Sequence, residues 1–398
     1  MPLRLRNLAF WASVSLFAEV TAGELIGWTR FALGSDLRGP DFFSYYAMSL
    51  LMLRQGPSHA YDAASQKHFQ ELVTAQWQGH FILLPHLLPP WATLSLYPLG
   101  LLPYRGAYLA WGIAIIALVA AGIAILVRAA DLQGRPAILS AVAAASSVPV
   151  TVDLLQGQSD ALMIPALGAC ALYWVRGQPG RAGVFAALAM VKPQMILLLP
   201  VFFLVRRSWR ALAGFAVTGS LLVAVSLAVF GVSACLQWLS VLAPWASAGS
   251  QDFPVDSQSQ YSLRGLLQLL SLPAAVQLVV LALGLLLVAA VLGRSRADAR
   301  LQLALAIAGS VALSAYQHAH DLALLVVPGL LLAGALPAVS RRVAGMVLLI
   351  GGWIALGLLI LAPVVTAIAV VGLAAYLAFE CLGVPARRAG EDPLPVPG

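Results

Sequence analysis

A carboxylate stands beside a run of aromatic residues near the start of the chain, in residues 39–46. Asp41 follows Gly39 and Pro40, a pair that favours a turn, and precedes a stretch with the apolar spacing of a helix. A helix N-terminus favours an ionised carboxylate, and an ionised carboxylate near a hydroxyl group can act as a general base. The alternative is that Asp41 only caps the helix expected to begin at Phe42.

A second polar group occupies residues 153–160, at an expected turn between two apolar segments. Gln156 and Gln158 carry amides, which both donate and accept hydrogen bonds and therefore suit sugar hydroxyl groups. Asp153 and Asp160 flank these amides. We expect Gln158 and Asp160 to contact a sugar or an acceptor. The alternative is an ordinary polar turn in which Asp160 caps the next helix.

Lys192 lies between two apolar runs and is followed by Pro193 and Gln194. A lysine inside a membrane is costly and marks a functional site by default. A lipid-linked phosphate is the anionic partner expected at this depth, with Arg264 and Arg38 as further phosphate ligands. The alternative is that the Lys192 side chain extends to the outer lipid headgroups.

Residues 314–321 bring two histidines and a carboxylate together: His318, His320 and Asp321. Two histidines separated by one residue face opposite sides of a regular helix, so the spacing does not predict a metal site. We expect His320 to assist the phosphate and His318 and Asp321 to contact the sugar or acceptor. The alternative is a polar helix end at the membrane interface.

The composition indicates that lipid surrounds the protein. Of 398 residues, 61% are hydrophobic and 10% charged, whereas a soluble domain has about 25% charged residues. The net charge of +7 is explained by arginines on cytoplasmic loops rather than by nucleic-acid binding. The three cysteines show no disulfide or zinc spacing. Neither a phosphate-binding Walker loop nor a dinucleotide-binding glycine pattern is found, so we expect no cofactor and a donor presented from the membrane.

An apolar segment of about 20 residues can span a membrane, and about twelve spans are predicted. The fifth and sixth, 180–192 and 194–205, are short, and the alternatives for them are a pair of half-helices or one broken hairpin. Each short inner connection between them carries at least a pair of arginines, which predicts that both termini are cytoplasmic. A cleaved signal peptide at the N-terminus is the alternative to an uncleaved first span. The predicted spans are 8–30, 106–127, 137–155, 161–175, 180–192, 194–205, 211–230, 274–292, 301–317, 322–339, 343–361 and 364–382.

Two long segments are predicted on the outer side, within a single membrane domain of residues 1–386. The first, 31–105, contains amphipathic helices at 42–54 and 62–79 and an interfacial or re-entrant hairpin at 91–103. The second, 231–273, is a polar loop that ends in a short helix at 263–270. Residues 387–398 form a cytoplasmic tail expected to be disordered.

An ordered set of short motifs over residues 35–330 resembles glycosyltransferase family 87, the family of polyprenol-phosphate-mannose-dependent α-(1→2)-mannosyltransferases. Each motif alone is unspecific, and their order carries the resemblance. In this chain the motifs are Asp41 with its aromatic run 42–46, Ala60-Tyr61-Asp62, Pro89-Pro90, Tyr97-Pro98-Leu99, residues 107–111, Gly157-Gln158-Ser159, Lys192-Pro193-Gln194, residues 206–209, and Ser314 with His320.

The resemblance implies the C-type glycosyltransferase fold in a bacterial inner membrane, with the active site on the periplasmic side. It implies a polyprenyl-phosphate sugar donor, mannose or in some relatives arabinose, and a glycolipid or glycan acceptor. Asp41 takes the role of base and His320 that of the late histidine, and we add Tyr45 to the sugar-contacting residues. Leu87 and Leu88 replace the usual tyrosine before the Pro-Pro pair, with His86 nearby, which leaves the acceptor open.

Two other classes of function remain at this point. A transporter or flippase of a lipid-linked sugar would use the same basic residues but would not need a base in an outer loop. Transporters often show two related halves, and no internal repeat is found in this sequence. A structural subunit of an envelope assembly would use the polar outer residues only as an interface.

Overall fold

The computed structural model describes residues 3–34, 41–75, 77, 84–247, 260–335 and 363–383. Every regular element in this described part is a helix, which confirms the predicted all-α class. The elements are α1 (Leu3–Leu33), α2 (Phe42–Gln55), η1 (Pro57–His59), α3 (Ala63–Thr74), α4 (Pro90–Thr93), η2 (Leu94–Leu101), α5 (Tyr104–Ala129), α6 (Gly134–Ala145), α7 (Val148–Gln156), η3 (Asp160–Leu162), α8 (Met163–Val175), α9 (Pro179–Leu188), η4 (Pro193–Ile196), α10 (Leu198–Val205), α11 (Trp209–Ser247), α12 (Leu263–Leu269), α13 (Ala274–Arg294), α14 (Ala299–Ala312), η6 (His320–Leu325), α15 (Val326–Ala335) and α17 (Pro363–Gly383), where η denotes a 3₁₀ helix.

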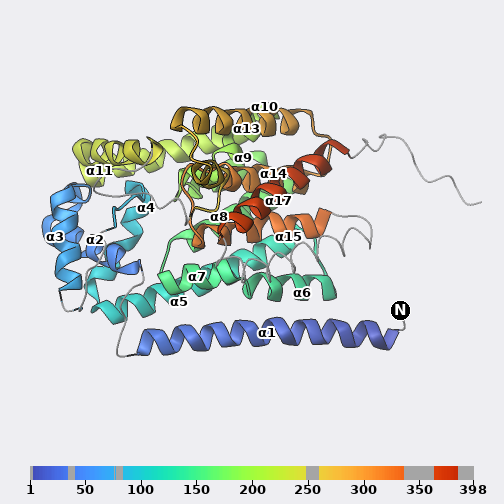
Figure 1. Cartoon of the computed structure of the whole chain (residues 1–398), viewed down its shortest axis with the longest axis horizontal. Coiled ribbons are helices and arrows are strands. Elements are labelled where there is room, and N and C mark those ends of the chain that lie inside the picture. Colours follow the sequence, from blue (N-terminus) through green and yellow to red (C-terminus); the bar gives the residue numbers. More distant parts are fainter. Residues whose placement is uncertain are drawn as a thin grey trace, which may run out of the picture.

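The long helices form a bundle with a smaller helical layer at one end (Figure 1). α1 runs along one side and packs on α5 and α6. α8 packs on α5 and α9, and α9 packs on α11. The first predicted outer segment forms the end layer, where α2 packs against α3 and η2.

Within the described residues, five helices are long and apolar enough to cross a membrane: α1, α5, α11, α13 and α17. α6 and α7 form a sixth candidate, bent by 43°. The chain is therefore a membrane-integral protein. The remaining apolar helices are shorter than the roughly 20 residues of a simple span. The predicted number of spans stays a prediction, and the span predicted at 343–361 lies outside the described residues.

Several predicted elements agree closely with the observed helices. α1, α5, α13 and α17 contain or match the spans predicted at 8–30, 106–127, 274–292 and 364–382. α2 and α12 match the helices predicted at 42–54 and 263–270. α3 ends at Thr74 and is therefore shorter than the helix predicted at 62–79. The hairpin predicted at 91–103 consists of two short helices, α4 and η2. The predicted tail 387–398 lies outside the described residues.

Two segments differ from the prediction. α11 continues as a helix to Ser247, through residues predicted to form a polar loop, after a kink at Gly231 whose φ of 79° suits glycine. α14 ends at Ala312, and residues 313–319, predicted in part as the end of a span, form no regular helix. Both differences concern the outer side of the predicted topology.

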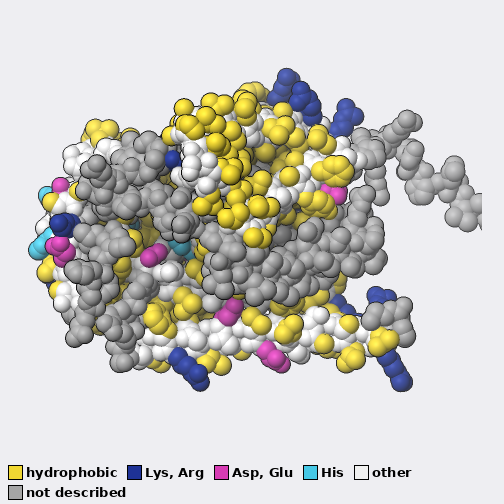
Figure 2. Space-filling view, viewed as in Figure 1, with side chains coloured by type: hydrophobic (Ala, Val, Ile, Leu, Met, Phe, Trp, Pro, Cys, Tyr) yellow, Lys and Arg dark blue, Asp and Glu magenta, His cyan; other side chains and the backbone are white. Residues whose placement is uncertain are grey.

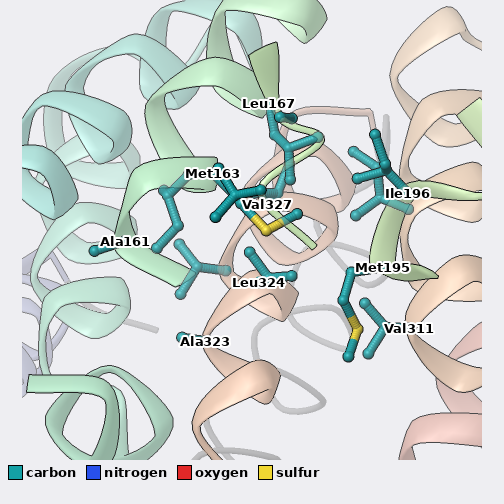
Figure 3. Close-up of a cluster of buried hydrophobic side chains, with 14 of the residues drawn as sticks. Ala161, Met163, Leu167, Met195, Ile196, Val311, Ala323, Leu324 and Val327 are labelled. Atoms are coloured by element: carbon teal, nitrogen blue, oxygen red, sulfur yellow. The ribbon is translucent and has the colours of Figure 1, made fainter. Parts of the chain in front are cut away.

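An apolar cluster lies where several short elements meet (Figure 3). Met163 and Leu167 of α8 meet Met195 of η4 and Leu324 of η6, all fully buried. Val311 of α14 completes this contact. The polar residues of interest lie at the starts of such short elements: Asp160 begins η3, Lys192 immediately precedes η4, and Asp321 is the second residue of η6. Packing of the apolar cluster therefore brings three distant polar residues to one place.

Charged and apolar side chains are distributed unevenly over the surface (Figure 2). Hydrophobic side chains cover a broad area over the α13 side, as expected for helices that face lipid. Groups of Lys and Arg lie at the end where α1 begins, and histidines lie at the opposite end over α3. The two ends of the molecule thus differ in their titratable groups.

The contact between α9 and α11 depends on small residues. A methyl group on Gly183 would overlap the backbone of Ala211, and one on Gly214 would overlap Gly180. We predict that Gly183→Ala destabilises the protein by about 1–3 kcal/mol through overpacking.

Gly372→Ala in α17 is the matched control, because nothing lies within 4 Å of the added methyl group. Thermal denaturation in detergent, followed by the fraction of monodisperse protein, measures both variants. Equal midpoints for the two variants would contradict the close α9–α11 contact.

Candidate functional site

Lys192 is the centre of a buried ionic cluster. Its Nζ lies 2.7 Å from Oδ2 of Asp160 and 2.6 Å from Oδ1 of Asp321. The Lys192 side chain is 10% exposed, and those of Asp160 and Asp321 are 0% and 2% exposed. Such charge-assisted hydrogen bonds are strong away from water. The side chain does not extend to lipid headgroups, and Asp160 uses its carboxylate for this ion pair rather than for a helix cap.

Carboxylates outnumber ammonium groups in this cluster. Asp153 is fully buried, and its Oδ1 accepts a hydrogen bond from the backbone N–H of Asp160 at 3.2 Å. Asp153 and Asp160 each retain one buried oxygen without a hydrogen bond. Two of the three N–H groups of Lys192 already donate to carboxylates. A donor phosphate at Lys192 would therefore have to compete with these acidic groups, and the predicted phosphate contact remains a prediction.

Within the described residues, one group of side chains could hold a metal ion: Asp160, His320 and Asp321. One ligand atom each from Asp160, His320 and Asp321 lies within 4.8 Å of the others. The Lys192 ammonium lies against both carboxylates, and a metal ion bound by both would have to displace it. The Lys192 ammonium group thus already supplies the positive charge between these two carboxylates. The expectation of a site without metal stays a prediction.

The irregular segment 313–319 and the start of η6 bring the rings of His318 and His320 close together. The backbone N–H of His318 donates to Oδ2 of Asp321 at 2.6 Å. Nε2 of His318 is hydrogen-bonded to the hydroxyl group of Tyr316. The rings of His318 and His320 lie 5.8 Å apart between centroids. A regular helix would have separated them, so the early end of α14 decides this arrangement.

Asp41 occupies the cap position of α2 but does not cap it with its side chain. Instead, Oδ2 of Asp41 accepts a hydrogen bond of 2.8 Å from Nε2 of Gln158. The backbone N–H of Asp41 donates to Oε1 of Gln156 at 3.0 Å. Both contacts join the start of α2 to the turn after α7, more than 110 residues later. The side chain of Asp41 therefore does not cap α2, and its role as a base stays a prediction.

The turn after α7 is shaped to receive α2. Gly157 has a φ of 63°, in the left-handed region that favours glycine. A methyl group on Gly157 would lie 2.8 Å from Cβ of Phe42, so the two segments make close contact. Nε1 of Trp111 donates to the carbonyl group of Gly157 at 2.9 Å. α5 thereby holds the turn in place beside Asp41.

Two residues predicted to contact a sugar are hydrogen-bonded to each other. The hydroxyl group of Tyr45 donates to Oε1 of Gln158 at 2.9 Å and lies 3.2 Å from Oγ of Ser159. Tyr45, Gln158 and Ser159 are all buried. Gln158 thus uses both ends of its amide inside the protein.

The surroundings of Asp41 determine its proton affinity. Burial raises the pKa of its carboxyl group above 3.8, because desolvation disfavours the charged form. The hydrogen bond from Gln158 and the nearby His318 and Lys192 act in the opposite direction on this pKa. The half-buried carboxyl group therefore has a stronger affinity for protons than a solvated one, as a general base requires.

Of the two arginines predicted as phosphate ligands, Arg264 is among the described residues and Arg38 is not. Arg264 of α12 is 3% exposed, and its Nη1 donates to the carbonyl group of Ala315 at 2.8 Å. Its guanidinium group therefore lies against segment 313–319 at Ala315. Arg38 lies outside the described residues.

One buried group near Tyr45 was not among the predicted site residues. His86 is 2% exposed, and its Nε2 lies 2.8 Å from Oγ1 of Thr93. Its ring contacts those of Tyr45 and Tyr61 at 5.8 and 6.0 Å between centroids. Burial lowers the pKa of His86 to about 3, so the ring is neutral. The sequence showed His86 only as a departure from a motif, and no spacing linked it to Thr93.

A family model described as glycosyltransferase family 87 matches residues 87–328, more than half of the chain. The matched region includes Gln158, Asp160, Lys192 and Asp321 and begins after Asp41. No curated protein and no solved structure gives a match.

We predict that Lys192→Met destabilises the protein by about 3–5 kcal/mol, because it leaves two buried carboxylates without their cation. The double substitution Lys192→Met with Asp321→Asn recovers part of this loss by removing one charge. Thermal denaturation in detergent measures each variant.

The control is Lys67→Met, since Lys67 lies 3.9 Å from Glu71 in an exposed pair, which contributes at most about 1 kcal/mol. If Lys192→Met is no less stable than Lys67→Met, the cluster does not hold the site together.

Proposed function

The chain belongs to glycosyltransferase family 87, and we propose that it transfers a hexose from a polyprenyl-phosphate donor. The family makes the protein a membrane glycosyltransferase with a sugar donor and an acceptor. Mannose is the proposed sugar, and a glycolipid or glycan is the proposed acceptor. The reaction takes place at the periplasmic face of a bacterial inner membrane, and the fold is the C-type glycosyltransferase fold.

One observation carries this proposal: Asp41 has a half-buried carboxylate with one oxygen engaged. Oδ2 accepts from Gln158, whereas Oδ1 has no hydrogen bond to any part of the chain that the structure describes. Oδ1 is therefore the oxygen that takes a proton from the acceptor. A general base of this kind contributes about 10²–10⁴-fold to the rate.

The proposed reaction is a single displacement. The acceptor oxygen attacks the anomeric carbon as its proton passes to Oδ1 of Asp41. The bond between the anomeric carbon and the phosphate oxygen breaks, and polyprenyl phosphate leaves with the electron pair. Attack opposite the leaving group inverts the anomeric configuration.

The leaving phosphate needs positive charge and hydrogen-bond donors. Arg264 contacts segment 313–319 at Ala315. His318 belongs to this segment and His320 to the start of η6, where Nε2 of His320 lies 3.7 Å from Oδ1 of Asp321. Lys192 has one N–H group beyond those that donate to Asp160 and Asp321. We therefore assign the main phosphate contacts to Arg264 and His320, with Lys192 in a supporting role and Arg38 as a further candidate.

The orientation in the membrane follows from the distribution of charge. Lys and Arg gather at the end where α1 begins (Figure 2), and cytoplasmic loops are the ones enriched in such residues. α2, which follows Asp41, lies at the other end (Figure 1). This arrangement supports cytoplasmic termini and a periplasmic site.

We predict that Asp41→Asn lowers the rate of transfer by about 10²–10⁴-fold, because asparagine keeps the shape of the side chain but cannot take the proton. Membranes that contain the variant receive a radiolabelled polyprenyl-phosphate sugar, and transfer to endogenous acceptors is measured.

The control is Asp62→Asn, because Asp62 caps α3 through the N–H of Ser65 and lies outside the site. It should transfer at nearly the parental rate. Transfer by Asp41→Asn at the parental rate would remove Asp41 from the role of base.

We also predict an acid limb in the pH dependence of the transfer rate. Protonation of Asp41 abolishes its action as base, and burial raises its pKa above 3.8, so activity falls with decreasing pH and its midpoint lies above 3.8. The amount of monodisperse protein at each pH separates this loss from unfolding. A midpoint at or below 3.8 would contradict a buried carboxylate base.

A further inference from the structure

A chain of hydrogen bonds leads from the interior to the carboxylate of Asp41. Oγ of Ser159 lies 3.2 Å from the hydroxyl group of Tyr45, which donates to Oε1 of Gln158 at 2.9 Å. Nε2 of Gln158 then donates to Oδ2 of Asp41 at 2.8 Å. All four residues come from two segments, the turn after α7 and the start of α2.

The chemistry of each group determines which atom donates in this series of hydrogen bonds. An ionised carboxylate only accepts hydrogen bonds, so Gln158 must present its NH₂ group to Asp41. The amide oxygen of Gln158 then faces Tyr45, whose hydroxyl group has a single proton and gives it to Gln158. Ser159 is left to donate to Tyr45. Each donor therefore determines the orientation of the next group.

Packing holds Tyr45, the tyrosine in this series of hydrogen bonds, in place. Tyr45 is 7% exposed, and its ring packs edge-on against that of His86. His86 is itself held by Thr93 at 2.8 Å. Since the ring of Tyr45 cannot move freely, its hydroxyl group keeps the Gln158 amide from rotating.

We propose that Gln158 and Tyr45 are positioning residues for the Asp41 base rather than ligands of the sugar. Gln158 holds one carboxylate oxygen so that the other faces the acceptor, and Tyr45 keeps the Gln158 amide in the donating orientation. This inference rests on the proposed function only where it names Asp41 as the base.

The electrostatic effect of Gln158 on Asp41 is measured against the other titratable groups that act on Asp41 within the described residues. Lys192 precedes η4, His318 and Tyr316 belong to segment 313–319, and Tyr45 belongs to α2. The hydrogen bond from Gln158 is the contact that lies on the carboxylate itself. Its loss favours the protonated form of Asp41.

The test uses dicyclohexylcarbodiimide, which modifies protonated carboxyl groups in apolar surroundings. The full-length protein in membranes is labelled over a range of pH, and peptide mass spectrometry measures the modified fraction at Asp41. Gln158→Leu should move the pH of half-labelling upward by about one unit. Tyr45→Phe, which keeps the aromatic ring, should move it upward by less.

Two comparisons make the result specific. Gln156→Leu changes the neighbouring glutamine, which contacts only the backbone N–H of Asp41, and should leave half-labelling at the parental pH. The double variant with Tyr45→Phe and Gln158→Leu should match Gln158→Leu alone, because both substitutions act through one amide.

An unchanged half-labelling pH in Gln158→Leu would overturn the proposal, and so would full additivity in the double variant. If Gln158→Leu does not reach the membrane, Tyr45→Phe is the deciding variant. An upward shift in its pH of half-labelling supports the positioning role, and an unchanged pH of half-labelling overturns it.

Transfer kinetics separate positioning from sugar binding. With a polyprenyl-phosphate sugar as donor, positioning predicts that Tyr45→Phe lowers kcat and moves the acid limb upward while KM for the donor stays within about twofold. A raised KM with an unmoved acid limb would assign Tyr45 to the sugar and overturn the proposal. Absence of transfer by the parental protein would refute the proposed function. The labelling shifts test the positioning of Asp41 separately, because labelling does not require sugar transfer.

Discussion

The site depends on neutralising one ammonium group in the protein interior. An isolated buried charge is strongly destabilising, and Asp160 and Asp321 meet Lys192 from two other parts of the chain. The apolar residues that follow each of these three pack in one cluster (Figure 3). The ionic contacts and the apolar contacts therefore hold the same junction of η3, η4 and η6 together.

One short turn connects this cluster to the candidate base. Residues 156–160 contact Asp41 through Gln156 and Gln158 and contact Lys192 through Asp160. This turn therefore joins the cluster around Lys192 to the residues that hydrogen-bond to Asp41. Such an arrangement suits a transfer in which phosphate charge and proton removal change together.

The parts of the fold that depend on apolar length and local signals were predictable. α5 and α13 follow long uninterrupted apolar segments, and α12 begins where its helical pattern begins. Residues 313–319 were predicted in part as the end of a span (to residue 317), whereas α14 ends at Ala312; the carbonyl group of Ala315 accepts a hydrogen bond from Arg264 of α12, a contact that the sequence alone did not indicate. The helical extension of α11 to Ser247 likewise has no local signal that distinguishes it from a polar loop.

The candidate site divides in the same way. The sequence by itself determined a membrane-integral protein and the set of polar residues that lipid surroundings make costly, including Asp41, Lys192 and Asp321, because composition and hydropathy act locally. Only the tertiary structure decided the partners: Lys192 meets two carboxylates, and Gln158 meets Asp41 and Tyr45. Those pairings join residues more than 30 positions apart, and only the packing of the helices between them brings them within hydrogen-bonding distance.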